Sequence, residues 1–167
     1  MNKTLIVYGT RRGTTTDTVQ TIAEILKSDY NQQVDICESG QLRVYKKRLN
    51  EFNNIIIGSS IVSARWKSQI LSFAKKDIFK GKNVAIFVTA GGTLNKVQKY
   101  GLTKSDATNE AIVKYIDKYL KKFKFDPISK TAFGGKVIKR EILRYDSWDK
   151  SDIIAWAHEM GIKLNQI

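Results

Sequence analysis

Short runs of apolar residues alternate along the chain with longer segments in which apolar residues recur at helical spacing. The apolar runs predict five β-strands, at residues 5–8, 34–37, 55–58, 84–89 and 128–133. Parallel strands need crossover connections, and such crossovers are right-handed, so this alternation predicts an α/β fold. We expect a single three-layer α/β/α sandwich with the parallel sheet in its middle.

Three helical segments are recognised by their apolar faces. The first has its face at Val19, Ile22, Ala23 and Leu26. A second stripe is made up of Ile112, Tyr115, Ile116, Tyr119, Leu120 and Phe123. The last is made up of Ile153, Trp156, Ala157 and Met160. We expect the last helix to begin at Asp146 or Ser147, which can cap it, and to end near Gly161.

Composition favours one domain over residues 1–167. An apolar content of 42% is enough for a core, and no linker or break in composition marks a second unit. The apolar residues near the start are too few for a signal peptide or a membrane span, so we expect a cytoplasmic protein. The chain has one Cys and one His, which excludes an internal disulfide and a clustered His/Cys metal site.

The segment after the first strand has the composition of a phosphate-binding loop. It reads Thr10-Arg11-Arg12-Gly13-Thr14-Thr15, and an amphipathic helix follows at once. A helix N-terminus offers unpaired N–H donors and a partial positive charge, and hydroxyl and guanidinium groups beside it suit a dianionic phosphate. We therefore predict that this loop holds a terminal monophosphate.

Two commoner glycine-rich motifs do not match this loop. Gly9 and Gly13 do not form the Gly-x-Gly-x-x-Gly of a dinucleotide site, which argues against Glu38 as a ribose ligand. The Gly-Lys-Ser/Thr of a P-loop is missing as well. The remaining alternative is an ordinary strand-to-helix turn whose threonines only cap the helix.

Two further loops are expected at the same site, because ligands of open α/β sheets bind beyond the carboxyl ends of the strands where the strand order reverses. The loop after the third strand contributes Ser59, Ser60, Ile61, Ser63 and Trp66. The loop after the fourth strand contributes Thr89, Ala90, Gly91, Gly92, Thr93 and Asn95. We predict that backbone amides of these loops contact the edge of a planar ring. Trp66 either stacks on that ring or belongs to the core.

These motifs resemble those of the flavodoxin-like superfamily, whose first loop has the pattern Thr/Ser-x-Thr-Gly-x-Thr around the phosphate of FMN. Within it, the chain is similar to the menaquinone-dependent protoporphyrinogen oxidase branch, with Thr-Arg-x-Gly-x-Thr in residues 10–15 and Ile-Gly-x-Ser-Ile in residues 57–61. The resemblance extends to Tyr145-Asp146-Ser147-Trp148. It implies FMN as cofactor, bound by the loop residues named above, and a five-stranded sheet of order 2-1-3-4-5.

Two departures from the resembled proteins bear on function. Members of the oxidase branch carry a long basic and hydrophobic insertion after the last strand, associated with the membrane and its quinones, whereas here only residues 134–144 lie between strand and helix. Flavodoxins that shuttle electrons are typically acidic, whereas this chain has a net charge of +13. Coupling to quinones and a partner suited to an acidic carrier are therefore not implied.

The positive charge occurs in four clusters. They are Arg43, Lys46, Lys47 and Arg48; Lys75, Lys76, Lys80 and Lys82; Lys114, Lys118, Lys121 and Lys122, expected on one helical face; and Lys136, Lys139, Arg140 and Arg144. Each is either a solvated face or a surface that attracts an anionic partner, and the last lies nearest the expected ring. The clusters leave room for peripheral membrane contact, but nucleic acid is not favoured because no aromatic platform accompanies them.

Two functions fit these observations. The first is an FMN-binding electron carrier that exchanges electrons with a reductase system or an acidic redox partner protein. The second is an FMN-dependent oxidoreductase that acts directly on an anionic, protoporphyrinogen-like tetrapyrrole. Neither function needs a catalytic acid or base from the protein, because the flavin supplies the chemistry. A flavodoxin-like scaffold without a cofactor is a third alternative.

Overall fold

The structure, a computed structural model, describes residues 2–166 and contains a five-stranded parallel sheet of order β2-β1-β3-β4-β5. The strands are β1 (Lys3–Gly9), β2 (Gln33–Glu38), β3 (Asn54–Ser60), β4 (Asn83–Thr89) and β5 (Ser129–Phe133). Each predicted strand is present within two residues of its expected ends. The expected α/β class and strand order are confirmed.

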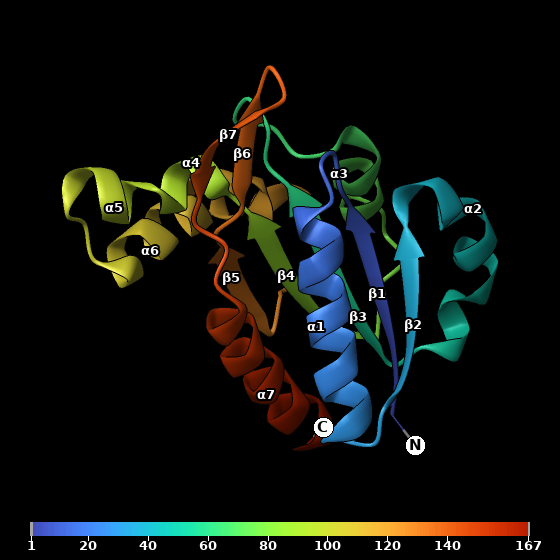
Figure 1. Ribbon diagram of the computed structural model, residues 1–167. Helices are drawn as coiled ribbons and strands as arrows, with labels where there is room; N and C mark the ends of the chain where they lie inside the picture. Colours follow the sequence, from blue (N-terminus) through green and yellow to red (C-terminus); the bar gives the residue numbers. More distant parts are fainter. Residues whose placement is uncertain (1, 167) are drawn as a thin grey trace.

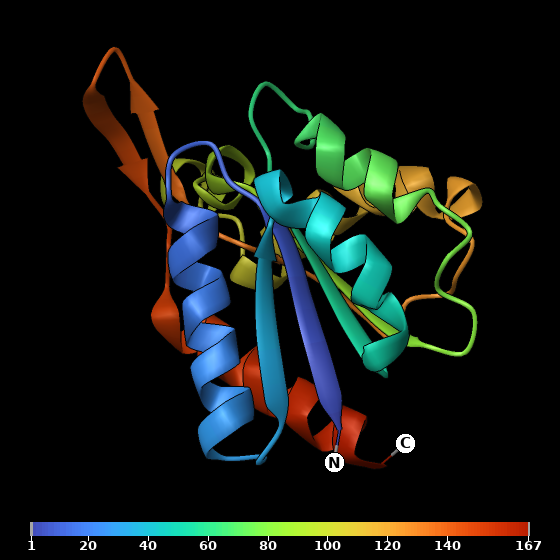
Figure 2. The same ribbon diagram turned by 90° about the vertical axis from the view of Figure 1, so that its right-hand side faces the viewer.

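Helices cover both faces of the sheet (Figures 1 and 2). Side chains alternate along β1, so that Leu5 and Val7 pack on one face while Ile6 and Tyr8 pack on the other. One face is covered by α1 (Thr14–Ser28) and α7 (Lys150–Gln166), and the other by α3 (Ser68–Ala74) and α6 (Lys104–Tyr115). The apolar faces predicted for α1 and α7 are buried there.

Shorter elements complete the chain. They are the helices α2 (Leu42–Tyr45), α4 (Gly91–Leu94) and α5 (Lys96–Tyr100), the 3₁₀ helices η1 (Ser39–Gln41), η2 (Lys46–Glu51) and η3 (Asp117–Lys122), and the antiparallel strands β6 (Lys136–Lys139) and β7 (Ile142–Asp146). The β6–β7 hairpin was not expected from the sequence. Among residues 2–166, none of the helices combines the length and the apolarity needed to cross a bilayer.

The stripe predicted over residues 112–123 does not belong to one α-helix. The α-helix ends at Tyr115, and η3 continues with the tighter 3₁₀ spacing, in which the Tyr119 N–H donates to the Ile116 carbonyl. The Tyr115 carbonyl instead accepts a hydrogen bond of 2.6 Å from the Trp66 indole N–H. The predicted cluster of Lys114, Lys118, Lys121 and Lys122 therefore does not lie on one helical face.

The last helix also differs from its prediction. It begins at Lys150 and continues past Gly161 to Gln166. Gly161 does not end the helix, because its role is in packing: a Cβ atom there would lie 2.3 Å from Cδ2 of Tyr30. The Tyr30 hydroxyl is in turn hydrogen-bonded to His158 Nδ1 at 3.1 Å. Gly161 is needed for its close approach to the Tyr30 ring, and its prediction as the C-terminal end of the helix is wrong.

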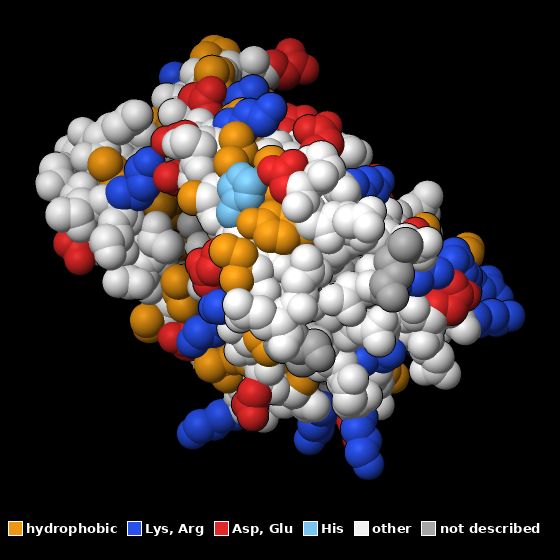
Figure 3. Space-filling model, turned by 90° about the horizontal axis from the view of Figure 1, so that it is seen from below, with side chains coloured by type: hydrophobic (Ala, Val, Ile, Leu, Met, Phe, Trp, Pro, Cys, Tyr) orange, Lys and Arg blue, Asp and Glu red, His pale blue; other side chains and the backbone are white. Residues whose placement is uncertain are grey.

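The basic clusters have different local roles. Arg48 forms ion pairs with Asp35 and Glu51, and the Lys82 ammonium donates to the Leu49 and Phe52 carbonyls at 2.8 Å each. Burial lowers the pKa of Lys82. At the end of the molecule where the chain termini lie, Lys and Arg side chains are interspersed with Asp and Glu (Figure 3). The excess positive charge is therefore not gathered on that face.

The packing role of Gly161 can be tested by its replacement with Ala. In an exposed helix this change stabilises by about 1 kcal/mol. Here we expect the free energy of unfolding to fall by about 1–3 kcal/mol, because the added methyl group meets the Tyr30 ring. Urea unfolding of Gly161→Ala measures the effect, with Gly40→Ala as control, since a Cβ at Gly40 meets nothing within 4 Å. A raised unfolding midpoint in Gly161→Ala would contradict the assignment.

Candidate functional site

A cavity of about 460 Å³ lies beyond the carboxyl ends of β1, β3 and β4. The strand order reverses there, between β1 and β3, which is the place where open α/β sheets bind ligands. Its walls come from residues 10–12, 14–15, 60–64, 89–93 and 135–139, together with Lys96, Lys114 and Tyr115. The three predicted loops therefore meet at one site, and the β6–β7 hairpin adds a fourth wall.

The first wall is the loop that leads into α1. Gly13 adopts φ +85°, which favours glycine, and its N–H donates to Thr10 Oγ1 at 2.9 Å. No side chain caps α1, so the N–H groups of its first turn have no side-chain acceptor among the described residues. This loop thus presents free donors and the positive end of a helix of 15 residues to the cavity.

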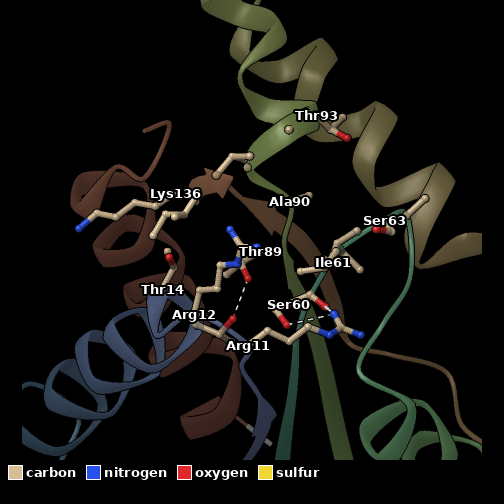
Figure 4. Close-up of a pocket in the computed structure, with 18 of the residues that line it drawn as sticks. Arg11, Arg12, Thr14, Ser60, Ile61, Ser63, Thr89, Ala90, Thr93 and Lys136 are labelled. Atoms are coloured by element: carbon tan, nitrogen blue, oxygen red, sulfur yellow. Dashed lines mark hydrogen bonds between the residues drawn. The ribbon is translucent and has the colours of Figure 1, made fainter. Parts of the chain in front are cut away.

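The two arginines of this loop diverge (Figure 4). Arg12 points toward the middle of the cavity-lining group, and among residues 2–166 its guanidinium has no acidic partner. Arg11 turns to the loop after β3 and donates to the carbonyls of Ser60 at 3.1 Å, Arg65 at 3.2 Å and Trp66 at 2.7 Å. Arg12 is available to a ligand, whereas Arg11 holds a neighbouring loop.

The loop that Arg11 holds contains a tight turn. Val62 and Arg65 exchange two backbone hydrogen bonds of 3.1 and 3.0 Å, and the two residues between them, Ser63 and Ala64, have φ values of 49° and 59°. Two successive left-handed residues define a type I′ turn, which is normally built from Asn and Gly. With side chains present, this conformation costs on the order of 1–3 kcal/mol per residue. The three carbonyl contacts of Arg11 flank the turn and stabilise it.

Hydrogen bonds between the walls fix the remaining loops. Thr15 Oγ1 and Thr89 Oγ1 lie 2.8 Å apart, and Thr93 Oγ1 and the Tyr115 hydroxyl lie 3.1 Å apart. The N–H groups of Ile61 and Ala90 donate to the carbonyls of Thr89 and Phe133. Those two amides, predicted to contact a ring edge, are therefore used within the protein.

Most of the predicted site residues line the cavity. They are Thr10, Arg11, Arg12, Thr14, Thr15, Ser60, Ile61, Ser63, Thr89, Ala90, Gly91, Gly92 and Thr93. The cavity does not include Gly13, Ser59, Trp66 or Asn95. Gly13 shapes the loop by its backbone, and Ser59 Oγ is buried and accepts the Lys67 N–H at 3.0 Å. Asn95 is buried behind the cavity.

Trp66 is a core residue. Its side chain is 3% exposed, its indole N–H is bonded to Tyr115, and its ring packs against those of Tyr119 and Phe123. Of the two alternatives left open by the sequence, the core position is the one that the structure shows. A flavin in this cavity would not stack on Trp66.

Several lining residues were missed by the sequence analysis. They include Val62, Ala64, Lys96, Tyr115, Gly135, Val137 and Ile138. Lys136 and Lys139, which also line the cavity, were expected near the ring only as members of a basic cluster. The two adjacent β-branched residues Val137 and Ile138 are a weak strand signal that could have indicated β6. Tyr115 carries no such signal, because its place in an apolar stripe is that of any core residue.

Comparison with known proteins shows a family and a fold. Residues 5–161 match the Flavodoxin domain family. No curated protein matches the chain in sequence.

Similar solved structures include rubredoxin oxygen:oxidoreductase from Desulfovibrio gigas, with a TM-score of 0.65 and 15% identity over 99% of this chain and 37% of that one. Oxidised flavodoxin 2 from Bacillus cereus has a TM-score of 0.58 and 15% identity over 98% of both chains. A flavodoxin variant from Fusobacterium nucleatum, bound to flavin mononucleotide, has a TM-score of 0.51 and 15% identity over 99% of this chain and 94% of that one. The chain thus spans about a third of the first protein and nearly all of the other two.

The role of Arg11 can be separated from that of Arg12 by hydrogen exchange. We expect Arg11→Met to speed amide exchange in residues 61–65 by about tenfold or more, because it removes charge-assisted hydrogen bonds that flank a strained turn. The matched variant Arg12→Met, one residue away, should leave exchange there unchanged. Equal effects of the two variants would show that Arg11 does not hold the loop.

Proposed function

The chain belongs to the flavodoxin-domain family, and on that premise we propose that its cavity binds FMN, with the phosphate at residues 10–15. The observation that carries this proposal is the uncapped N-terminus of α1 beside a free Arg12 and the hydroxyl-bearing Thr10 and Thr14. The flavodoxin from Fusobacterium nucleatum, which has the same fold, is bound to flavin mononucleotide. Both features support a terminal phosphate as the anchor of the ligand.

The rest of the cavity suits a planar heterocycle. A volume of about 460 Å³ lies within the range of small-molecule sites. Its walls beyond the phosphate loop carry the aliphatic side chains of Ile61, Val62, Val137 and Ile138. Gly92 leaves room for a close approach, whereas the missing Cβ of Gly91 makes room for the Gly135 carbonyl. Tyr115 is the one aromatic residue among the described residues that line it. Ring contacts are therefore mainly aliphatic.

The protein's own part in the chemistry is to bind and to orient. When bound, FMN accepts and releases electrons. The described lining residues include no Asp, Glu, His or Cys, and the titratable side chains of the walls are those of Arg, Lys and Tyr115. The hydrogen bond between Thr15 and Thr89 keeps the phosphate loop in register with β4, and Arg11 keeps the loop after β3 in place. No catalytic residue is assigned.

Electron transfer to a partner protein is the function that this arrangement supports best. A site lined by no carboxylate, imidazole or thiol among the described residues suits a carrier, and the neighbour from Bacillus cereus, matched over 98% of both chains, is a flavodoxin. The net charge of +13 favours an acidic partner, because a strong field of one sign steers association with the opposite sign. We propose an acidic redox protein or reductase as that partner.

A second function, direct oxidation of an anionic substrate, is favoured by Lys114, Lys136 and Lys139 in the cavity wall. The motifs Thr-Arg-x-Gly-x-Thr and Ile-Gly-x-Ser-Ile favour the protoporphyrinogen oxidase branch and a tetrapyrrole with propionate groups.

Stopped-flow reoxidation separates the two functions. Anaerobically reduced protein is mixed with a porphyrin-type compound, a quinone or an acidic redox protein. We expect the acidic redox protein alone to reoxidise it rapidly, at a rate that depends on salt. Rapid reoxidation by the small molecules would favour the oxidoreductase.

The phosphate anchor can be tested by ligand affinity. We expect FMN to bind more tightly than riboflavin, and Arg12→Gln to weaken FMN binding about 10- to 100-fold, because it removes one charge-assisted hydrogen bond to a phosphate. Lys118→Gln, an equal change of charge at an exposed position outside the cavity, should leave the dissociation constant unchanged. Quenching of flavin fluorescence measures both ligands. Equal affinities for FMN and riboflavin would contradict the anchor.

A further inference from the structure

The β6–β7 hairpin stands clear of the sandwich at the carboxyl end of the sheet (Figures 1 and 2). Its two strands pair antiparallel from Lys136 with Asp146 to Lys139 with Ile142. The two residues of its turn, Arg140 and Glu141, both have positive φ values, which defines a type I′ turn. Apart from each other, β6 and β7 pair with no other strand in residues 2–166.

The base of the hairpin is fixed to the cavity. The Ser147 hydroxyl donates to the Gly91 carbonyl at 3.1 Å and accepts the Gly135 N–H at 3.2 Å. The Ser147 N–H donates to the Gly135 carbonyl at 3.2 Å. The hairpin therefore rises from a defined position beside the loop after β4, and its residues 136–139 form part of the cavity wall.

The strand farther from the cavity, β7, exposes apolar side chains. Ile142 is 54% exposed, Leu143 52% and Tyr145 40%. A two-stranded ribbon without a covering layer gains little stability from such residues. Contiguous exposed apolar residues with a polar rim mark an interaction site rather than a feature of the isolated fold.

Positive charge surrounds these apolar residues. The hairpin carries Lys136, Lys139, Arg140 and Arg144 against the two acidic residues Glu141 and Asp146. Within residues 2–166, none of the four cations forms an ion pair. Helix α4 contacts both strands of the hairpin, and α5 follows it in the chain. In α5 the Lys99 ammonium lies 5.1 Å from the centroid of the Tyr100 ring, and Tyr100 is 64% exposed. The apolar side chains thus lie in a basic surrounding.

We propose that the hairpin, with Lys99 and Tyr100 of α5, is the docking surface for an acidic redox protein and places that protein at the mouth of the cavity. This inference rests on the proposed function, since it locates the partner of that same site. Unpaired cations would steer the acidic partner, and the exposed apolar side chains would form the desolvated centre of the contact. Because residues 136–139 also line the cavity, the docked partner lies within reach of the bound cofactor.

Two other occupants fit the surface less well. A second copy of this chain would bring four cations of one hairpin against four of another, at a net charge of +13 per chain. A lipid bilayer would meet the turn residues Arg140 and Glu141 first. The Glu141 carboxylate would then have to enter the bilayer before the aliphatic side chains of β7. Charge complementarity therefore favours an acidic protein.

A purified acidic plant-type ferredoxin is a suitable probe. We expect it to bind the FMN-loaded protein at low salt, with amide NMR shifts concentrated in residues 99–100 and 140–145. The double variant Arg140→Glu/Arg144→Glu should weaken binding about tenfold or more, and Leu143→Ser about threefold or more. None of these replaced residues lines the cavity, so FMN affinity should not change.

Matched controls are available on the opposite edge of the sheet. Arg43→Glu/Lys47→Glu makes the same change in net charge, and Val44→Ser replaces a residue that is 62% exposed. Both should leave the ferredoxin affinity within about twofold of the original, because screening limits the reach of exposed charges. Circular dichroism checks that each variant is folded.

Three results would overturn the inference. They are no ferredoxin binding at low salt, equal losses in the hairpin and control variants, and binding to phosphatidylserine vesicles that is lost in Leu143→Ser. Retained FMN affinity in such a case would show that the docking surface fails while the cofactor site stands. Loss of FMN binding with normal ferredoxin docking would show that the cofactor site fails while the docking surface stands.

Discussion

A parallel sheet that is covered by helices on both faces leaves only the ends of its strands for a ligand. In this protein both faces of the sheet are packed, and the apolar residues of β1 alternate between two cores. The carboxyl ends of β1, β3 and β4 then have to supply both the cavity and its walls. The loops at this edge are held together by both side-chain and backbone hydrogen bonds.

Arg11 and Arg12 show how two adjacent residues of one type divide these tasks. Arg11 satisfies three carbonyls around a strained turn, and burial lowers the pKa of its guanidinium. Arg12 has no such partners and points to the cavity. The first contributes rigidity to the wall, and the second presents an unpaired positive charge to the cavity, which we propose to bind the phosphate. A loop with two arginines can thus serve structure and binding at once.

The sequence predicted the strands, the first helix and the three loops that meet at the cavity, because each depends on local chemistry. Apolar runs mark buried parallel strands, and hydroxyl-bearing residues next to a helix start mark an anion site. Trp66, Gly161 and the 3₁₀ segment after Tyr115 depend on residues far away in the sequence. The Trp66 indole N–H donates to the Tyr115 carbonyl, where the α-helix ends, and Gly161 packs against the Tyr30 ring. The hairpin left only a weak signal, because β6 and β7 pair with no other strand in residues 2–166 and every residue of β7 is exposed.

The same two strands that expose Ile142 and Leu143 to solvent also present Val137 and Ile138 to the cavity. A substitution that alters the twist or register of this ribbon would change its outer edge and the polarity around the ligand together. If the hairpin is the docking surface that we propose, selection for a new partner would then shift the redox potential of the bound cofactor as well. In this architecture, the choice of redox partner and the driving force of electron transfer are expected to evolve as one trait.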